Sequence, residues 1–321
     1  MRVGINPEKK KKEKIIYKQH RIIIPVYIPD SEDDYFKNSE KVFYLSINSL
    51  LRTIDKSETN ITIINNNCKK EVADYIKSLF EKKEIEKLVN YSVNYGKVYS
   101  VLQEAKAAYE PFITIADADV FFFSNWQNKA QLIFESFKNV GVVGLTPDPH
   151  MAFYCNTSFW ATKLFFVKKG KVVKDFDLEL FERGINNKNF FFTKKYNWKN
   201  YQYYIKKNDC IAIVGASHFA SVYKKEVFHS LPFASPIYVF PGGELNYIDI
   251  PIDKLGYYRL SVEKAMVYHM GNTLCNEFNL DNLVNNHLIN KKHINKNELT
   301  LNLSYILRDI FLRILRKLNI Y

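Results

Sequence analysis

The sequence predicts an α/β fold in which a mostly parallel sheet is flanked by helices. Up to residue 116, short apolar runs alternate with segments whose apolar residues recur at helical spacing. The apolar runs are nearly continuous, as expected of parallel strands buried on both faces. The chain has 321 residues, 47% of them hydrophobic, and can therefore bury a substantial core.

Each element of the first half has its own local signal. The run RIIIPVYIP at 21–29 predicts a buried strand that a proline ends. The segment 39–55 has apolar residues at Val42, Leu45, Leu50 and Ile54, which is the spacing of a helix. The same reasoning predicts, in order, a strand at 61–67, a helix at 70–83, a strand at 87–93, a helix at 98–110 and a strand at 112–116.

The second half is less regular. We expect a strand and loop at 141–149 and a hairpin at 165–174, within a region rich in aromatic residues and lysine. The tail 299–321 predicts an amphipathic helix with basic residues outside its apolar stripe. The stripe consists of Leu303, Leu307, Ile310, Ile314 and Leu318.

The net charge of +12 is concentrated at the two ends of the chain. Residues 1–21 hold eight basic and two acidic residues, a net +6, and residues 286–321 hold seven and two, a net +5. The body therefore carries only +1. A nucleic-acid binder more often carries positive charge on its folded surface, so we expect no nucleic-acid partner. Basic tails suit an anionic surface such as a membrane, or are simply solvated.

Cysteine usage and the ends of the chain indicate a cytoplasmic protein. The four cysteines are far apart and form no CxxC pair, which argues against a zinc cluster and fits reduced thiols. The start, MRVGINPEKKKKEK, lacks the apolar segment of a signal peptide. No apolar stretch approaches the ~20 residues that span a bilayer.

Two carboxylates close the strand at 112–116. Asp117 and Asp119 follow the apolar run directly, at the carboxyl end where ligands of parallel sheets bind. Two acids at i and i+2 can converge on one cation, and such hard oxygen ligands suit Mg²⁺ or Mn²⁺. A divalent ion there would neutralise a diphosphate leaving group.

Five segments in this order resemble the GT-A fold glycosyltransferases, in particular family 2. They are RIIIPVYIP, similar to the family's first strand; ITIINNNC, similar to its second; the stretch from NYGKVYS to ADADV, similar to its N-x-G segment, helix and Asp-x-Asp strand; IVGASHFASVYKKEVFHSLPF, similar to the segment before its acceptor site; and GGELNYIDIPIDKLGYYRLSVEKAMVYHMGN, similar to its G-E-D segment and last strand.

The resemblance implies a metal-dependent inverting glycosyltransferase that moves a sugar from a nucleotide-diphosphate donor to a hydroxyl of a glycan or lipid-linked acceptor. It implies an N-terminal basic tail (1–20), one GT-A domain (21–285) with a nucleotide-binding half to about 120 and an acceptor half beyond, and a basic helical tail (286–321). The residues that the resemblance assigns to the metal, Mn²⁺ or Mg²⁺, are Asp117, Asp119 and His269. Those it assigns to binding the donor are Pro25, Tyr27, Asn65, Asn66, Gly96, Lys97 and Asp117, and those it assigns to binding the acceptor are Gly215, His218 and Gly243.

Two departures from the family's pattern bear on activity. Asn65 stands where the family commonly has an aspartate that accepts from the nucleotide base, and an amide both donates and accepts. Leu245 stands where the family usually has its catalytic base. Glu244 is therefore the first candidate for the base and Asp249 the second, because a base must reach the acceptor hydroxyl.

Other readings stay open. Loss of the acid at 245 fits a non-catalytic relative that binds carbohydrate or nucleotide. A nucleotidyltransferase would need a glycine-rich phosphate loop near its start, which IPVYIP does not supply. Trp160, Trp198 and the other aromatic residues of 153–204 form either a sugar-stacking wall or core. The C-terminal helix either binds an anionic membrane surface or packs on the body or on a second subunit as a homodimer.

Overall fold

The computed structural model describes residues 3–10, 17–192, 196–235, 242–274 and 303–317. A ten-stranded sheet crosses the molecule in the order β3-β2-β1-β4-β10-β6-β11-β9-β8-β7. Its strands are β1 (His20–Val26), β2 (Thr59–Asn66), β3 (Lys87–Tyr91), β4 (Phe112–Ala116), β6 (Val140–Gly144), β7 (Lys168–Gly170), β8 (Gln202–Lys207), β9 (Cys210–Val214), β10 (Ala220–Lys224) and β11 (Tyr258–Val262).

The sheet is mostly parallel, as predicted. The strands β3, β2, β1 and β4 pair in parallel, whereas β10 is antiparallel to both β4 and β6. Of the ten strands of this sheet, β10, β9 and β7 run antiparallel to the other seven. A separate two-stranded sheet joins β5 (Val120–Phe122) to β12 (Val267–His269).

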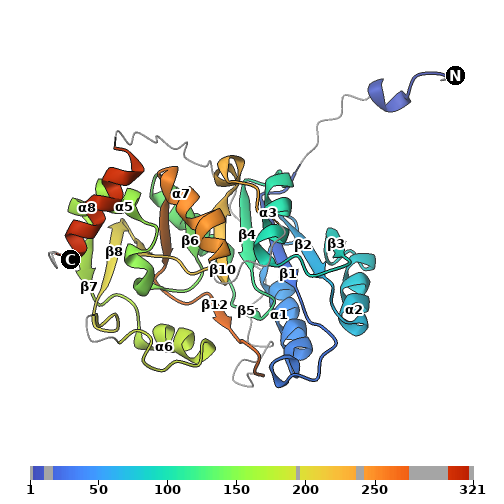
Figure 1. Ribbon diagram of the computed structural model, residues 1–321, viewed down its shortest axis with the longest axis horizontal. Helices are drawn as coiled ribbons and strands as arrows, with labels where there is room; N and C mark the ends of the chain where they lie inside the picture. The colour runs from blue at the N-terminus through green and yellow to red at the C-terminus, as the bar shows by residue number, and fades with distance from the viewer. Residues whose placement is uncertain (1–2, 11–16, 193–195, 236–241, 275–302, 318–321) are drawn as a thin grey trace.

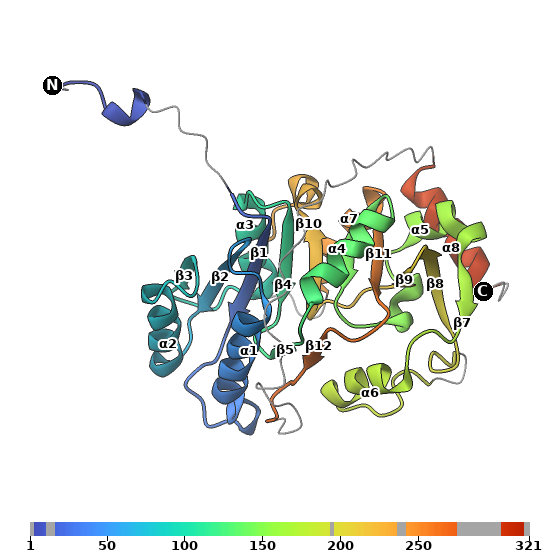
Figure 2. The same ribbon diagram turned by 180° about the vertical axis from the view of Figure 1, so that it is seen from behind.

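Helices cover both faces of the main sheet. The helices of the described residues are α1 (Ser39–Thr53), α2 (Lys70–Glu81), α3 (Lys97–Ala107), α4 (Trp126–Ser136), α5 (Thr157–Lys163), α6 (Asp175–Gly184), α7 (Ile250–Lys254) and α8 (Tyr305–Lys317). Of these, α6 packs on β12 of the small sheet and α8 packs on α5. Figure 1 shows α3 and α7 in front of the sheet, and Figure 2 shows α1 and α4 in front of the opposite face.

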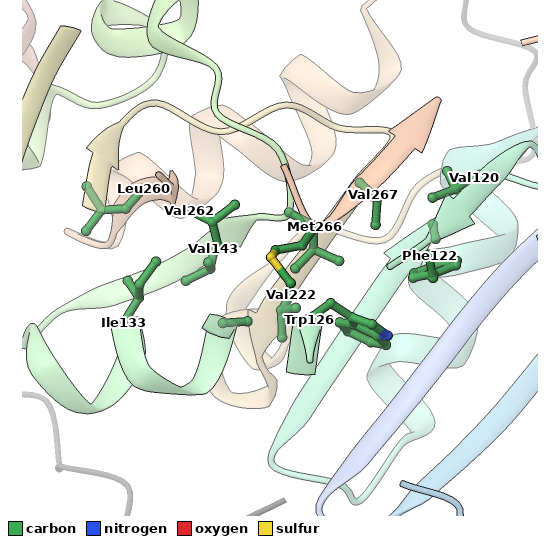
Figure 3. Close-up of a cluster of buried hydrophobic side chains, with 14 of the residues drawn as sticks. Val120, Phe122, Trp126, Ile133, Val143, Val222, Leu260, Val262, Met266 and Val267 are labelled. Atoms are coloured by element: carbon green, nitrogen blue, oxygen red, sulfur yellow. The ribbon is translucent and has the colours of Figure 1, made fainter. Parts of the chain in front are cut away.

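Side-chain alternation along the strands creates two cores. In β1, Ile22 and Ile24 face the core under α1 and α4, whereas Ile23 faces the core under α3. The first core continues to the centre of the sheet, where Val143 and Val222 belong to the same cluster of buried side chains as Trp126 of α4 (Figure 3). The strands therefore need apolar residues at consecutive positions, which is the pattern that the sequence shows.

The elements expected in the first half are confirmed to within a few residues, because their signals are local. The hairpin expected at 165–174 is wrong. The short β7 pairs with β8, more than thirty residues further on, and the backbone N–H groups of Val172 and Val173 donate to Oε1 of Gln202 at 2.8 and 3.1 Å. A buried glutamine thus replaces the second strand of the expected hairpin.

The C-terminal helix exists, but its apolar stripe is not its packed face. Within α8, the residues Arg308, Leu312 and Leu315 are buried, whereas Leu307, Ile310 and Ile314 are 53%, 48% and 48% exposed. Arg308 anchors the helix because its guanidinium donates to Ser158 of α5 and, at 3.1 Å, to the carbonyl of Lys254. Leu318 and residues 299–302 lie outside the described residues.

Gly215 is required by packing. Its φ is +117°, and an added Cβ would lie 2.5 Å from the carbonyl oxygen of Asp148. We expect Gly215→Ala to lower the free energy of unfolding by about 1–3 kcal/mol, measured by urea denaturation. The matched control is Gly170→Ala, whose Cβ would meet only Tyr204, at 3.9 Å. Equal destabilisation by both variants would show that strain at residue 215 is not the cause.

Candidate active site

The site lies at the carboxyl end of β4, where the parallel part of the sheet meets the antiparallel β10. Asp117 follows β4, and its backbone N–H donates at 2.8 Å to the carbonyl of Phe219, just before β10. Asp119 then precedes β5, whose partner β12 ends at His269. The pairing of β5 with β12 therefore brings a histidine 150 residues away in sequence to the two aspartates.

Asp117, Asp119 and His269 form a group suited to a divalent cation. Each offers one ligand atom, and these atoms lie within 4.8 Å of one another. Nε2 of His269 is 3.3 Å from Oδ2 of Asp119, and its Nδ1 is 3.3 Å from the carbonyl oxygen of Gly184. A proton on Nδ1, donated to Gly184, leaves Nε2 free to bind a metal.

The remaining oxygen of Asp119 also fits a metal. Oδ1 is buried and has no hydrogen-bond partner in the described part of the chain. An unpaired buried carboxylate oxygen is costly unless a cation satisfies it. The donor set of two carboxylates and one imidazole suits Mn²⁺ or Mg²⁺ better than a softer metal.

Lys97 joins the aspartates to a third carboxylate. As the first residue of α3, it places Nζ 2.5 Å from Oδ1 of Asp117 and 2.7 Å from Oε1 of Glu244. Burial opposes the charge on Lys97, but Asp117 and Glu244 together raise its pKa. In turn Lys97 holds the pKa of Glu244 below its ordinary value, although burial acts the other way. Glu244 is therefore a carboxylate.

The cluster has more negative than positive charge. Burial raises the pKa of Asp117 above its ordinary value in spite of Lys97, and the neighbouring Asp119 and Glu244 add to the effect. Three carboxylates face one ammonium group here. Burial opposes a charge on His269, but Asp119 and Asp117 raise its pKa, so the imidazole helps to balance these carboxylates. The cluster still carries an excess of acidic groups, which a bound cation would offset.

A cleft of about 540 Å³ opens beside this cluster, a volume typical of small-molecule sites. Its lining includes most of the residues predicted for the donor and metal: Pro25, Tyr27, Asn66, Gly96, Lys97, Asp117, Asp119 and His269. Gly96 has a φ of +80° before α3, and its N–H donates to Oδ1 of Asn94 at 2.9 Å, so the N-x-G turn shapes the wall of the cleft.

Asn65 lies behind this wall. Its Oδ1 accepts from the backbone N–H of Cys68 at 2.9 Å, and its Nδ2 donates to Asn90 at 3.0 Å, so the side chain holds the turn after β2. The cleft is also lined by Tyr35, Ile185 and Asn186, which the sequence analysis did not single out. No local pattern singles out these three residues, because the segments that carry them meet the cleft only in the folded chain.

A second polar cluster lies beside the first, and Asp249 is its centre. Asp249 is fully buried, and its carboxylate accepts from Arg259, from Nε2 of His218 at 2.6 Å and from the hydroxyl of Tyr154 at 3.0 Å. Burial opposes the charge, but Arg259 and His218 hold the pKa of Asp249 below its ordinary value.

His218 connects the two clusters. Its Nδ1 is 4.0 Å from Oε2 of Glu244, and the side chains of His218 and Glu244 are 21% and 31% exposed. A single π-helical turn, Leu245–Asp249, separates the two carboxylates along the chain.

The two glycines predicted to line the acceptor site have structural surroundings. Gly243 is buried where this turn begins, and Gly215 packs against Asp148. The role of Arg259 was not predicted, because nothing near it in sequence signals a partner.

Comparison with known proteins identifies the family. The model named "Glycosyl transferase family 2" matches residues 35–231, more than half of the chain. The chain belongs to glycosyltransferase family 2. Among curated proteins no sequence matches it significantly.

Solved structures resemble the chain at low identity. One is S. aureus TarS 1–349 in complex with UDP, with 13% identity and a TM-score of 0.42, covering 78% of this chain and 60% of that one. Another is the mannosyltransferase PcManGT from Pyrobaculum calidifontis in complex with GDP-Man and Mn²⁺, with 9% identity and a TM-score of 0.42, covering 79% and 58%. The chain thus spans about 60% of the length of these proteins.

We expect Asp119→Asn to weaken Mn²⁺ binding at least tenfold, because it removes the charge of a ligand and leaves His269 without its acidic neighbour. Calorimetric titration of Mn²⁺ measures the change. The control is Asp74→Asn on the exposed side of α2, which should bind Mn²⁺ like the unmodified chain. Unchanged affinity in Asp119→Asn would place the cation elsewhere.

Proposed function

We propose that the chain transfers a sugar from a nucleoside-diphosphate sugar to a hydroxyl group of a glycan or lipid-linked acceptor, with inversion at the anomeric carbon. The observation that carries this proposal is the meeting of Asp117, Asp119 and His269 with Glu244 at one edge of the sheet, joined through Lys97. Membership of family 2 supports the reaction class.

On the donor side, the cleft beside β1 and α3 holds the nucleotide. Tyr27, which is 41% exposed, offers an aromatic surface, and Asn66 and Lys97 offer polar groups within the same cleft. Mn²⁺ or Mg²⁺ held by Asp117, Asp119 and His269 would neutralise the diphosphate leaving group. Lys97 stands beside these ligands and gives a second positive charge for the phosphates.

On the acceptor side, Glu244 is the base. The acceptor oxygen attacks the anomeric carbon, its proton passes to the Glu244 carboxylate, and the bond to the diphosphate oxygen breaks with its electron pair. Asp249 is fully buried with three hydrogen-bonding partners, so it serves to hold His218, which faces the acceptor. In this arrangement both Glu244 and Asp249 have a role, and no acid is needed at position 245.

The leucine at 245 also supports a second candidate, a binding protein of the same fold without catalysis. The two candidates differ in whether the donor is turned over. Incubation of UDP- and GDP-sugars with the chain and Mn²⁺, with no acceptor added, separates them: slow release of the nucleoside diphosphate supports the enzyme. Binding with no release, even when acceptor glycans are supplied, supports the binding protein.

Glu244→Gln keeps the shape of the side chain and removes the proton acceptor, so we expect turnover to fall ~10²–10⁴-fold. Donor affinity should change little or increase, because Lys97 loses one of its two acidic partners. Steady-state hydrolysis and calorimetry measure the two quantities. Asp249→Asn, in contrast, should act through the placement of His218. Near-normal turnover in Glu244→Gln together with its loss in Asp249→Asn would make Asp249 the base.

We further propose that the enzyme is cytoplasmic and binds anionic membrane surfaces through α8, which brings it to a lipid-linked acceptor. In the described residues no helix is long and apolar enough to cross a bilayer. The exposed face of α8 carries Ile306, Leu307, Ile310 and Ile314, and Arg313, Arg316 and Lys317 lie on the same helix. Each basic residue near an anionic leaflet adds ~1 kcal/mol. Arg308 does not contribute, because it is buried.

The triple variant Leu307→Gln, Ile310→Gln, Ile314→Gln should lose co-sedimentation with phosphatidylserine vesicles at low salt, because it removes the apolar face and leaves the buried Leu312 and Leu315 in place. Binding of the unmodified chain should weaken as salt rises. The control changes three exposed apolar residues elsewhere to glutamine: Phe80, Leu132 and Phe165. No vesicle binding, with a dimer in ultracentrifugation that the α8 variant dissociates, would assign this face to a second subunit.

A further inference from the structure

A second cavity of about 530 Å³ lies between α8, α5 and the segment after β6. It is nearly as large as the donor cleft, and the two share no lining residue. Figure 1 shows α8 and α5 side by side at the end of the sheet far from β3, and Figure 2 agrees. None of the residues proposed to bind the donor or the metal lines this cavity, so the proposed function does not yet assign it a ligand.

One wall of the cavity is aromatic and held in place. Phe153 stacks on Trp160 with ring centres 4.9 Å apart and planes 16° apart, and Tyr196 stacks on Trp198 at 5.0 Å and 17°. Trp160 and Trp198 are buried, so each lining ring rests on a fixed neighbour. Flat, supported aromatic faces of this kind pack well against the C–H face of a sugar ring.

The opposite wall, from α8, is positively charged. Arg313 and Arg316 both line the cavity together with one acid, Asp309. Nε of Arg313 donates to Oδ2 of Asp309 at 2.8 Å. Arg316 has no acidic partner among the residues that the structure describes, and its guanidinium carbon lies 5.8 Å above the ring of Phe153. A guanidinium above an aromatic wall is well placed to bind a carboxylate or phosphate carried by a sugar on that wall.

The cavity adjoins the proposed catalytic base. Leu245, which follows Glu244 directly, is part of its lining. Tyr154 lines it too and donates to Asp249, which in turn accepts from His218. A glycan that presents a hydroxyl to Glu244 would therefore extend its next sugar into this space.

We propose that the cavity binds an acidic sugar of the acceptor, with its carboxylate or phosphate on Arg316 and its ring against Phe153 and Tyr196. This inference rests on the proposed function and adds the acceptor's chemical class to it. The shared chemistry is an oxyanion on a pyranose ring, whether it belongs to a uronic acid or to a sugar phosphate.

The test uses glucuronate, glucose 1-phosphate and glucose as probes of the full chain, without metal, followed by saturation-transfer NMR. At least one of the two acidic sugars should bind at least tenfold more tightly than glucose, and which one does so names the anion. Arg316→Gln should lower the ratio of the acidic sugar's affinity to that of glucose at least tenfold. Lys317→Gln, the next residue of α8 and not part of the cavity, should keep it.

Two further measurements separate this inference from the proposed function. Binding of UDP or GDP with Mn²⁺ should be equal in Arg316→Gln and the unmodified chain, and saturating nucleotide should not displace the acidic sugar. Glucose binding as tightly as both acids, displacement by nucleotide, or an unchanged preference in Arg316→Gln would overturn the acidic-sugar site. Absence of nucleotide binding in every variant would overturn the proposed function but not the binding of an acidic sugar in the cavity.

Discussion

The site depends on the change of strand direction beside β4. On one side β4 pairs in parallel with β1, and on the other it pairs antiparallel with β10. The carboxyl end of β4 therefore meets the amino end of β10, which brings Asp117 next to the segment that carries His218. An all-parallel sheet would have placed that segment at the opposite edge. The cluster around Asp117 and the cluster around His218 are neighbours because of this one pairing.

The sequence predicts well whatever has a local cause. The strands and helices up to β4 have periodicity within each segment, and the cleft lined by Gly96, Lys97, Asp117 and Asp119 follows from where those segments end. His269 was predicted only through a resemblance to a family, since its approach to Asp119 depends on the pairing of β12 with β5. That pairing joins residues far apart in the chain, and periodicity carries no information about it.

The errors and omissions have the same origin. Gln202 replaces a hairpin strand from thirty residues away, and Arg259 neutralises Asp249 within the interior. In α8, Arg308 is buried and the apolar stripe is half exposed. Arg308 faces the body because Ser158 and the carbonyl of Lys254 accept its hydrogen bonds, which apolar side chains cannot donate. Amphipathic spacing identifies the helix, but the partner surface decides which side packs.

The π-helical turn Leu245–Asp249 has a consequence for how the site tolerates changes in chain length. Here the N–H of Ile250 bonds the carbonyl of Leu245, five residues back instead of four. In an ordinary α-helix, residues five apart point roughly 140° away from one another. The wider turn brings Glu244 and Asp249 towards the same side, where His218 lies between them. Deleting one residue between Glu244 and Asp249 would instead place the two acids four residues apart in an ordinary α-helix, where such residues share a face. The π-helical turn therefore accommodates one extra residue while keeping both acids close to His218.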